Sequence, residues 1–300
     1  MFLVNPASAA GSTGRRWPEI AYRAAEVGLS GDALFSERPG HLTELARQAA
    51  DDGVRLLVVV GGDGSVNETV NGIGDRADPP ELAVIPRGTG WDFVRTFGIP
   101  RRIEDAAAIA LGGVLRTLDV GKVSYRSWDG SDTDALFANV ASAGMSGAIA
   151  QRANETTKAL GGKASYLLAL FAVFARWSAN DMQVTVDGET RRGRMFDVVV
   201  ANGKFFGGGM KICPEALPDD GLLDVLTIGD VTKRDLVTTM PRIYRGTHLP
   251  HPKAELLRGR VVSVESDSPV PIELDGEQPG TTPARFEALP AKIRLRVPAA

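Results

Sequence analysis

Residues 56–73 constrain the fold of this 300-residue chain more than any other stretch, because they combine a buried strand, a glycine turn and the start of a helix. Leu56–Val60 is a run of apolar, mostly β-branched residues, which is typical of a strand buried on both faces of a parallel sheet. Gly61–Gly64 contains three glycines, which allow a tight turn with accessible backbone N–H groups. Apolar residues then recur at helical spacing over Ser65–Ile73, and a helix N-terminus attracts anions, most often phosphate. The stretch therefore predicts an α/β fold with a phosphate site in the turn.

The glycine pattern by itself fits more than one kind of site. Asn67 stands where the dinucleotide fingerprint G-x-G-x-x-G requires its third glycine, and the Gly-Lys-Ser/Thr ending of a P-loop is absent. A βα turn that uses glycine only for its geometry is an alternative. Asp63 is more informative, because a carboxylate inside an anion site would repel phosphate. A divalent cation or a water network is therefore expected beside Asp63.

The first 120 residues alternate between predicted strands and predicted helices, as in a parallel α/β sheet. The expected strands are Met1–Val4, Ala33–Ser36, Leu56–Val60 and Leu82–Pro86, and the expected helices are Trp17–Val27, His41–Asp51 and Glu104–Leu111. A second glycine turn, Arg87–Arg95, follows the last of these strands and also carries a carboxylate. Turns that follow neighbouring parallel strands lie at the same edge of a sheet, so both glycine turns are expected to line one crevice.

After about residue 120 the apolar runs predict strands, with few helices between them. The expected strands are Ala135–Ala141, Met182–Val186, Met195–Ala201, Leu222–Ile228, Val261–Val264, Val270–Leu274 and Ile293–Val297. This pattern predicts a β-sandwich-like domain over residues 121–300, after an α/β domain over residues 1–120, with Ile293–Val297 able to return to the first domain. The exception is Gly162–Trp177, an apolar helical pattern that fits core packing or, alternatively, a lipid pocket wall or membrane-surface segment.

Composition narrows the class of protein. The chain is 43% hydrophobic and 24% charged, which is typical of a soluble globular protein. Its net charge of −3 gives no basic footprint for nucleic acid. The single cysteine, Cys213, fits a reducing cytoplasm, and the longest apolar run is too short to span a bilayer. The three histidines have no cysteine or acidic cluster at the spacing of zinc ligands, which disfavours a zinc site. A Gly-x-Ser-x-Gly motif is also absent, which disfavours a hydrolase.

The motif Gly-Gly-Asp-Gly-Ser-x-Asn-Glu at Gly61–Glu68 resembles the nucleotide loop of the soluble diacylglycerol kinase and bacterial lipid kinase family, which is related to the sphingosine and ceramide kinases. Further blocks follow in the family's order and extend the resemblance over nearly the whole chain. They are Asn5-Pro6, Gly88–Arg95, Asn202–Met210, Pro214–Asp224 and Asp275–Glu277. The chain departs from the family at Trp91, where the family has Asn; Trp91 is able to stack on a base or to shape a specialised pocket.

The resemblance implies an ATP-dependent lipid kinase with a Rossmann-like α/β nucleotide-binding domain, a β-sandwich domain and an active site in the interdomain cleft. ATP and Mg²⁺ are the implied cofactors. The implied nucleotide contacts are Ser36, Gly61, Gly62, Asp63, Gly64, Ser65, Val66, Asn67 and Thr89. Asp63 is expected to take part in catalysis through the magnesium network, and Glu277 is implied to accept the proton of the attacking hydroxyl.

The acidic turn at Leu217–Leu222 has two interpretations. By spacing alone it is either a solvated turn or a site for a hard cation. The resemblance implies a structural magnesium held by the Asp220 carboxylate and by the backbone carbonyls of Leu217 and Leu222. This metal would brace the β-rich domain and lie outside the chemistry.

Three alternatives stay open at this stage. They are a kinase of NAD, a nucleotide-binding regulator that has lost catalysis, and an NAD-dependent oxidoreductase. The expected partners are a lipid alcohol substrate and, transiently, a membrane surface, so the chain is expected in the cytoplasm or peripheral to the membrane. The acceptor is open among diacylglycerol, a sphingoid base, a phosphatidylglycerol-like lipid and an isoprenoid alcohol, and a homodimer is also open.

Overall fold

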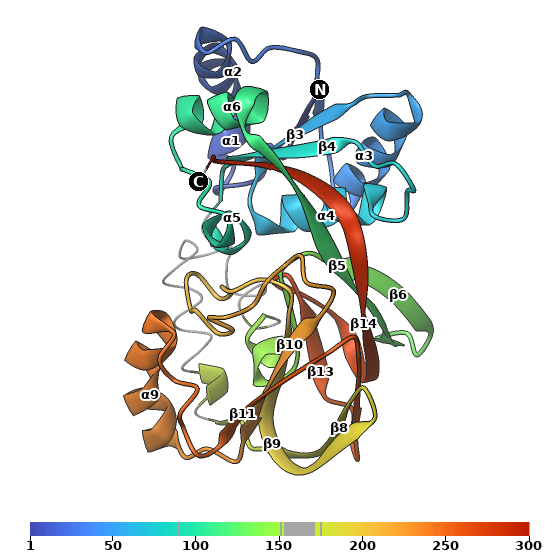
Figure 1. Cartoon of the computed structure of the whole chain (residues 1–300), viewed down its shortest axis with the longest axis vertical. Coiled ribbons are helices and arrows are strands. Elements are labelled where there is room, and N and C mark those ends of the chain that lie inside the picture. Colours follow the sequence, from blue (N-terminus) through green and yellow to red (C-terminus); the bar gives the residue numbers. More distant parts are fainter. Residues whose placement is uncertain (89, 151, 153–171, 175, 300) are drawn as a thin grey trace. The chain divides into compact units, whose positions relative to one another are not determined.

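The computed structural model describes residues 1–88, 90–150, 152, 172–174 and 176–299 (Figure 1). The chain divides into two compact units, Met1–Val120 with Pro290–Ala300, and Gly121–Leu289. The first unit alternates strands and helices and the second is mainly strands, which confirms the predicted fold class of an α/β domain and a β-rich domain.

The first unit is built on a parallel sheet. Its strands are β1 (Phe2–Val4), β2 (Ala33–Phe35), β3 (Leu56–Gly61), β4 (Glu81–Pro86) and the end of β14 (Glu277–Val297), in the order β14-β4-β3-β1-β2. Leu57 pairs with Leu82, and Phe2 pairs with Val58. The side chains of Val58–Val60 are buried, as expected for a central strand covered by helices on both faces.

Six helices accompany this sheet in the part of the unit that is described. They are α1 (Ser12–Arg15), α2 (Trp17–Glu26), α3 (His41–Asp51), α4 (Asp63–Ile73), α5 (Asp92–Thr96) and α6 (Ile103–Gly112). The carboxylate of Glu68 in α4 accepts the backbone N–H of Leu42 at 3.0 Å, at the start of α3. Thr43 Oγ1 donates to the Glu68 carbonyl at 2.9 Å, so Glu68 fixes α3 against α4. The glutamate that follows the glycine motif therefore has a structural role.

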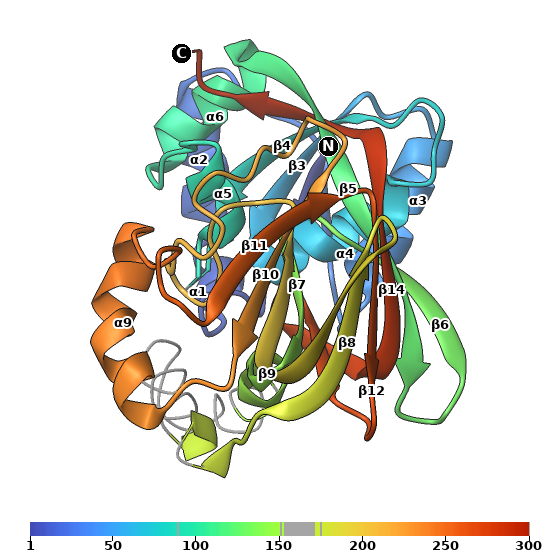
Figure 2. The ribbon, with the colours of Figure 1, turned by 60° about the horizontal axis from the view of Figure 1, so that its bottom comes forward.

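The second unit is built from antiparallel pairs. Its strands are β5 (Val114–Ser127), β6 (Asp132–Phe137), β7 (Val140–Gly144), β8 (Asn180–Val186), β9 (Glu189–Ala201), β10 (Leu223–Gly229), β11 (Ala254–Gly259), β12 (Val261–Ser266), β13 (Pro271–Leu274) and the first part of β14. The pairings β9-β7-β13-β14-β12-β8-β9 close into a ring, part of which is visible in Figure 2. Apolar side chains fill its interior, including Phe137 and Phe286, whose rings pack edge to face at 6.1 Å.

Helix α9 (Lys233–Arg245) was not expected from the sequence. Its β-branched residues and the internal Pro241 disfavour a helix. The Thr232 side chain accepts from the Asp235 N–H and the Asp235 side chain accepts from the Thr232 N–H, which is a capping box that starts the helix. Thr232-x-x-Asp235 was the available signal for this helix.

Two other differences concern residues 135–177. The strand expected at Ala135–Ala141 is divided into β6 and β7, because the Asp275 carboxylate accepts the backbone N–H groups of Ala138, Asn139 and Val140 and bends the chain. The helix expected at Gly162–Trp177 lies mostly outside the described residues. Among the helices that are described, none is long and apolar enough to cross a membrane.

Candidate active site

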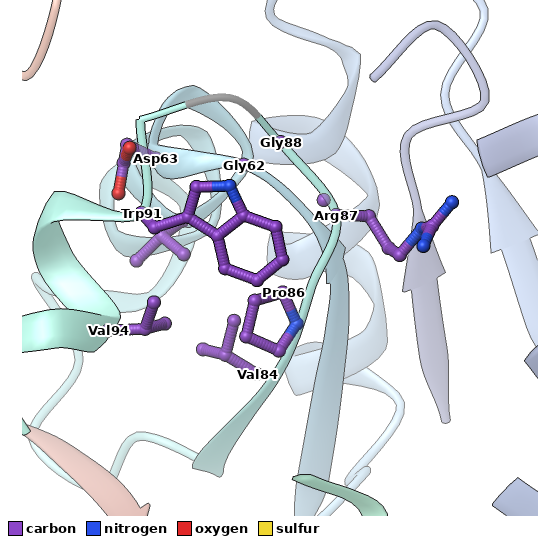
Figure 3. Close-up of a pocket in the computed structure, with 10 residues that line it drawn as sticks. Gly62, Asp63, Val84, Pro86, Arg87, Gly88, Trp91 and Val94 are labelled. Carbon is purple, nitrogen blue, oxygen red and sulfur yellow. The ribbon is translucent and has the colours of Figure 1, made fainter. Parts of the chain in front are cut away.

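The two glycine turns of the first unit touch each other at the carboxyl ends of β3 and β4. A Cβ on Gly88 would lie 2.7 Å from the Cα of Gly62, so no larger residue fits at position 88 without moving the turns apart. The backbone N–H of Arg87 donates to the Gly61 carbonyl at 2.6 Å and holds the turns in register. Figure 3 shows Gly62 and Gly88 above a pocket lined by Val84, Pro86 and other apolar side chains. The predicted convergence of the two turns is present in the structure.

The N-terminus of α4 lies at the contact between the two glycine turns, which we call the junction. Gly62 is the N-cap residue with extended backbone angles, and no side chain caps the helix. Asn5, at the end of β1, donates from Nδ2 to Ser65 Oγ at 3.0 Å and fixes the first turn of α4. A Cβ on Gly64 would meet no protein atom within 4 Å. This combination of uncapped helix and open space suits an anion.

Two carboxylates lie at the mouth of the second glycine turn. The Oδ1 atom of Asp63 accepts the Phe93 backbone N–H at 3.0 Å. A Cβ on Gly90 would lie 2.5 Å from Asp63 Oδ2 and 3.5 Å from Asp92 Oδ2, so the carboxylates of Asp63 and Asp92 flank the same glycine. Carboxylate oxygens are the ligands that a hard divalent cation prefers. The residues present therefore fit magnesium.

Arg87 adds a positive charge beside the same turns. One guanidinium nitrogen lies 3.3 Å from Ser12 Oγ, and the Nε–H is buried without a hydrogen-bond partner. Burial and, secondarily, the nearby Arg16 lower the pKa of the Arg87 guanidinium. Among the described residues no carboxylate lies within ion-pair distance of Arg87. An anion bound here would relieve both the burial cost and the repulsion.

Trp91 adopts a left-handed backbone conformation, with φ of 67°, at the N-cap of α5. Asn is favoured in that conformation and a bulky residue is not, which gives a physical reason for the Asn that the family carries. The Arg101 guanidinium lies 4.3 Å from the centroid of the Trp91 ring, and the indole lines the apolar pocket (Figure 3). One face of the indole is thus covered by Arg101.

In the second unit, Glu277 follows a tight hairpin turn between β13 and β14. Asp275 and Gly276 both have positive φ, 48° and 97°, which is the Asp-Gly hairpin geometry. The three backbone N–H groups bound to the Asp275 carboxylate and the Gly276 N–H bound to Glu273 hold the turn rigidly. Glu277 itself is exposed. Glu277 is therefore a solvent-exposed residue beside a turn whose backbone is held by hydrogen bonds.

Comparison with known proteins identifies the family. Residues 1–123 match the diacylglycerol kinase catalytic domain, and residues 139–297 match the YegS C-terminal NAD kinase beta sandwich-like domain. The chain belongs to the diacylglycerol kinase family. It is 26% identical over 296 residues to a diacylglycerol kinase of Staphylococcus saprophyticus, covering 99% of this chain and 94% of that one. It is 27% identical to a diacylglycerol kinase of Staphylococcus aureus, covering 99% of this chain and 91% of that one.

A solved structure supports the same family. A Bacillus anthracis str. Sterne protein, assigned provisionally as a diacylglycerol kinase, superposes with a TM-score of 0.78 at 25% identity and covers 99% of this chain and 96% of its own. The likeness spans both units of this chain, so the family assignment does not depend on the glycine motif alone.

The nucleotide contacts that the family resemblance implies are distributed around the junction. Gly61 ends β3, and Asp63, Gly64, Ser65, Val66 and Asn67 form the first turns of α4. Ser36 follows β2 at the same edge of the sheet, with its N–H bonded to the Val4 carbonyl at 2.9 Å. Thr89 lies outside the described residues. Their contact with a nucleotide stays a prediction.

The structural magnesium site at Asp220 stays a prediction as well. Asp220 Oδ1 accepts the Leu222 N–H at 3.0 Å, and Oδ2 accepts from the Arg258 guanidinium at 3.2 Å. In the part of the chain that is described, no group of three acidic, histidine or cysteine side chains is arranged to hold a metal. A cation at this turn would also have to compete with Arg258 for the Asp220 carboxylate. The absence of a three-ligand group among the described residues applies to Asp63 and Asp92 as well, so further ligands would be needed at both places.

Sequence reasoning did not assign roles to Arg87 and Asp92. Asp92 lies in the block Gly88–Arg95 that the family resemblance covers, and Arg87 immediately precedes that block. Only the fold brings Asp92 beside Asp63 and the Arg87 backbone beside Gly62. The available signal was the position of these residues immediately around a glycine turn at the end of a buried strand.

Proposed function

We propose that this chain is an ATP-dependent lipid kinase that transfers the γ-phosphoryl group of ATP to a hydroxyl of a lipid such as diacylglycerol. The observation that carries the proposal is the contact between Gly62 and Gly88, with an uncapped helix and two carboxylates beside it. Such an arrangement suits the polyphosphate of a nucleotide. The family, whose relatives are named diacylglycerol kinases, supports a lipid as the acceptor.

In this proposal the residues around the two glycine turns bind either the negatively charged phosphates or the cation that accompanies them. The first N–H groups of α4 and the guanidinium of Arg87 bind phosphate oxygens, and the open space at Gly64 admits them. Asp63 and Asp92 would hold magnesium, which would supply positive charge beside the phosphate groups. The hydrogen bond from Phe93 fixes the Asp63 carboxylate in place, so the ion site is formed before the nucleotide binds.

Glu277 is the proposed general base. The lipid hydroxyl loses its proton to the Glu277 carboxylate as its oxygen forms a bond to the γ-phosphorus, and the bond from that phosphorus to the bridging oxygen of ADP breaks. The support for this role is the family's Asp-Gly-Glu motif together with the rigid turn that presents Glu277. The proposal places the protein in the cytoplasm, where ATP is available, with transient contact to a membrane.

The test is phosphoryl transfer by the purified chain with labelled ATP. The acceptor panel contains diacylglycerol, a sphingoid base, phosphatidylglycerol, an isoprenoid alcohol and NAD. Transfer of the label to any of the lipid alcohols supports the proposal, whereas labelled NADP would identify an NAD kinase. ATP binding without transfer to any acceptor would identify a regulator that has lost catalysis.

A further inference from the structure

Helix α9 of the second unit has one face that the fold does not use. Its buried side chains contact the core through Ile243 and line an apolar pocket through Thr239 and Ile243. The opposite face is exposed over the whole length of the helix, at positions 233, 234, 237, 238, 241, 242, 244 and 245. The capping box at Thr232 and the interior contacts fix the orientation of this face.

The exposed face is strongly basic. It carries Lys233, Arg234, Arg242 and Arg245, whereas the chain as a whole has a net charge of −3. Within the described ranges no acidic side chain lies at ion-pair distance from the three arginines. The single acid of the helix, Asp235, is used in the capping box and lies on the partly buried side. The positive charge of these three arginines is therefore not paired with a carboxylate among the described residues.

Two large apolar side chains lie among these cations. Val237 is 59% exposed and Tyr244 is 43% exposed, although each belongs to a residue type that is usually buried or half-buried. They are seven residues apart, so they lie on the same side of the helix, about two turns from each other. Basic residues on a helix that also exposes apolar and aromatic side chains are typical of a helix lying in a membrane interface.

We propose that the exposed face of α9 binds the surface of an anionic membrane, the source from which a lipid kinase would take its substrate. This inference rests on the proposed function for its biological purpose. Arg234, Arg242 and Arg245 would bind lipid phosphates, and Val237 and Tyr244 would enter the headgroup region. A nucleic acid would bind the arginines through its phosphates but would offer no apolar environment for Val237 and Tyr244. This difference favours a membrane as the partner.

The binding test uses vesicles and no ATP, so its result is independent of whether the chain proves to be a kinase. Wild-type protein is sedimented with vesicles of phosphatidylcholine mixed with phosphatidylglycerol and with vesicles of phosphatidylcholine alone. Preferential binding to the anionic vesicles is expected. Replacing all three arginines (Arg234→Gln, Arg242→Gln, Arg245→Gln) should weaken that binding on the order of 10- to 100-fold.

A matched variant carries the same change in charge elsewhere, at three exposed arginines (Arg47→Gln, Arg55→Gln, Arg285→Gln). It should bind anionic vesicles nearly as wild type does. Equal loss in both triple variants, equal binding to neutral vesicles, or binding to RNA without binding to vesicles would each overturn the proposal. Val237→Ser with Tyr244→Ser should reduce binding even at high salt, where the arginines contribute less.

Activity supplies a second readout. The arginine variant should lose turnover of diacylglycerol in anionic vesicles and keep turnover of a short-chain, water-soluble diacylglycerol. Loss of both activities in the variant would mean that α9 supports the fold or the active site and would overturn the membrane role. Absence of any lipid phosphorylation by wild type would refute the proposed function and leave the vesicle result standing.

Discussion

The carboxylate of Asp63 accepts the backbone N–H of Phe93 at 3.0 Å, so the first residue of α4 also binds the first turn of α5. The bond is a second link between the two glycine turns, in addition to the contact between Gly62 and Gly88. Asp63 therefore has two roles that a single substitution need not remove together: it positions α5 and, as proposed, it holds a cation.

Asp63→Asn and Asp63→Ala separate these roles. Asn keeps an oxygen for the Phe93 N–H, so its melting temperature should stay near that of wild type while turnover falls on the order of 100-fold or more. Ala should lose the same turnover and also about 1–3 kcal/mol of stability. Thermal melting and initial rates of ATP-dependent transfer check both. Full turnover in the Asn variant would contradict the assigned role of Asp63.

Gly64→Ala and Gly88→Ala differ in what the new Cβ meets. At Gly64 it meets no protein atom within 4 Å, so stability should be kept and any loss of ATP affinity would report a ligand in that space. At Gly88 it would lie 2.7 Å from the Gly62 Cα, so the turns must separate and the melting temperature should fall. Calorimetric ATP titration and thermal melting measure the two effects. Unchanged ATP affinity in the Gly64 variant would argue against phosphate binding at α4.

Glu277→Gln should bind ATP as wild type does and lose turnover, because the amide cannot accept the hydroxyl proton. Glu265→Gln, at an exposed glutamate of β12, is the control and should leave turnover unchanged. The comparison requires initial rates at saturating ATP and equilibrium binding of ATP to each variant. If Glu277→Gln turns over normally, another group accepts the proton.

Two buried acids of the second unit predict how stability depends on pH. Burial raises the pKa of Glu273 from 4.5 to about 8 and the pKa of Asp197 from 3.8 to about 7. Hydrogen bonds from Gly276 to Glu273 and from Ser146 to Asp197 oppose part of this rise. Between pH 4 and pH 8 the folded chain thus binds more protons than the unfolded chain. Its free energy of unfolding should fall as pH rises through this window.

Glu273→Gln should flatten that dependence and raise stability at pH 9 by on the order of a few kcal/mol, because the neutral amide has no ionisation cost. Urea unfolding at pH 5, 7 and 9 gives the slope, with Glu265→Gln as the control. An unchanged slope in the Glu273 variant would show that this carboxyl titrates in the folded state as it does in the unfolded one.

Asp220→Asn tests the predicted structural magnesium. If a cation displaces Arg258 from this carboxylate, Mg²⁺ should raise the melting temperature of the nucleotide-free wild type and raise that of Asp220→Asn less. Asp63→Asn is the second arm, because it alters the other magnesium site. If Mg²⁺ does not change the melting temperature of the wild type, the prediction of a structural magnesium at Asp220 is wrong. The Asp220 side chain would then serve to bind Arg258 and the Leu222 N–H.

The sequence predicted those parts of the fold whose local pattern and tertiary environment agree. Leu56–Val60 is apolar throughout because β3 is buried on both faces. Gly61 and Gly88 have no room for a Cβ, because it would collide with the Ser65 side chain at Gly61 and with the Gly62 backbone at Gly88. Helix α9 was missed because its composition opposes a helix and its capping box and packing override that preference. The division of Ala135–Ala141 depends on Asp275, which is distant in sequence, so no local pattern contains it.

The candidate site was predicted as a motif and not as a set of contacts. Gly61–Asn67 and the second glycine turn were found because glycine after a buried strand is a local signal. Arg87 and Asp92 acquire their roles from the contact between two loops that are far apart in the chain, and the unpartnered Nε of Arg87 is visible only when its neighbours are known.

Strand β14 has a consequence for how the protein is made. Its end pairs with β4, and the Arg296 guanidinium binds the Glu81 carboxylate at 2.7 Å across 215 residues of sequence. Among the described strands only β14 covers that edge of β4. The sheet of the first unit therefore stays incomplete on the ribosome until the end of β14 has been translated, and a nonsense mutation before Ile293 would leave the edge of β4 available for pairing with other chains.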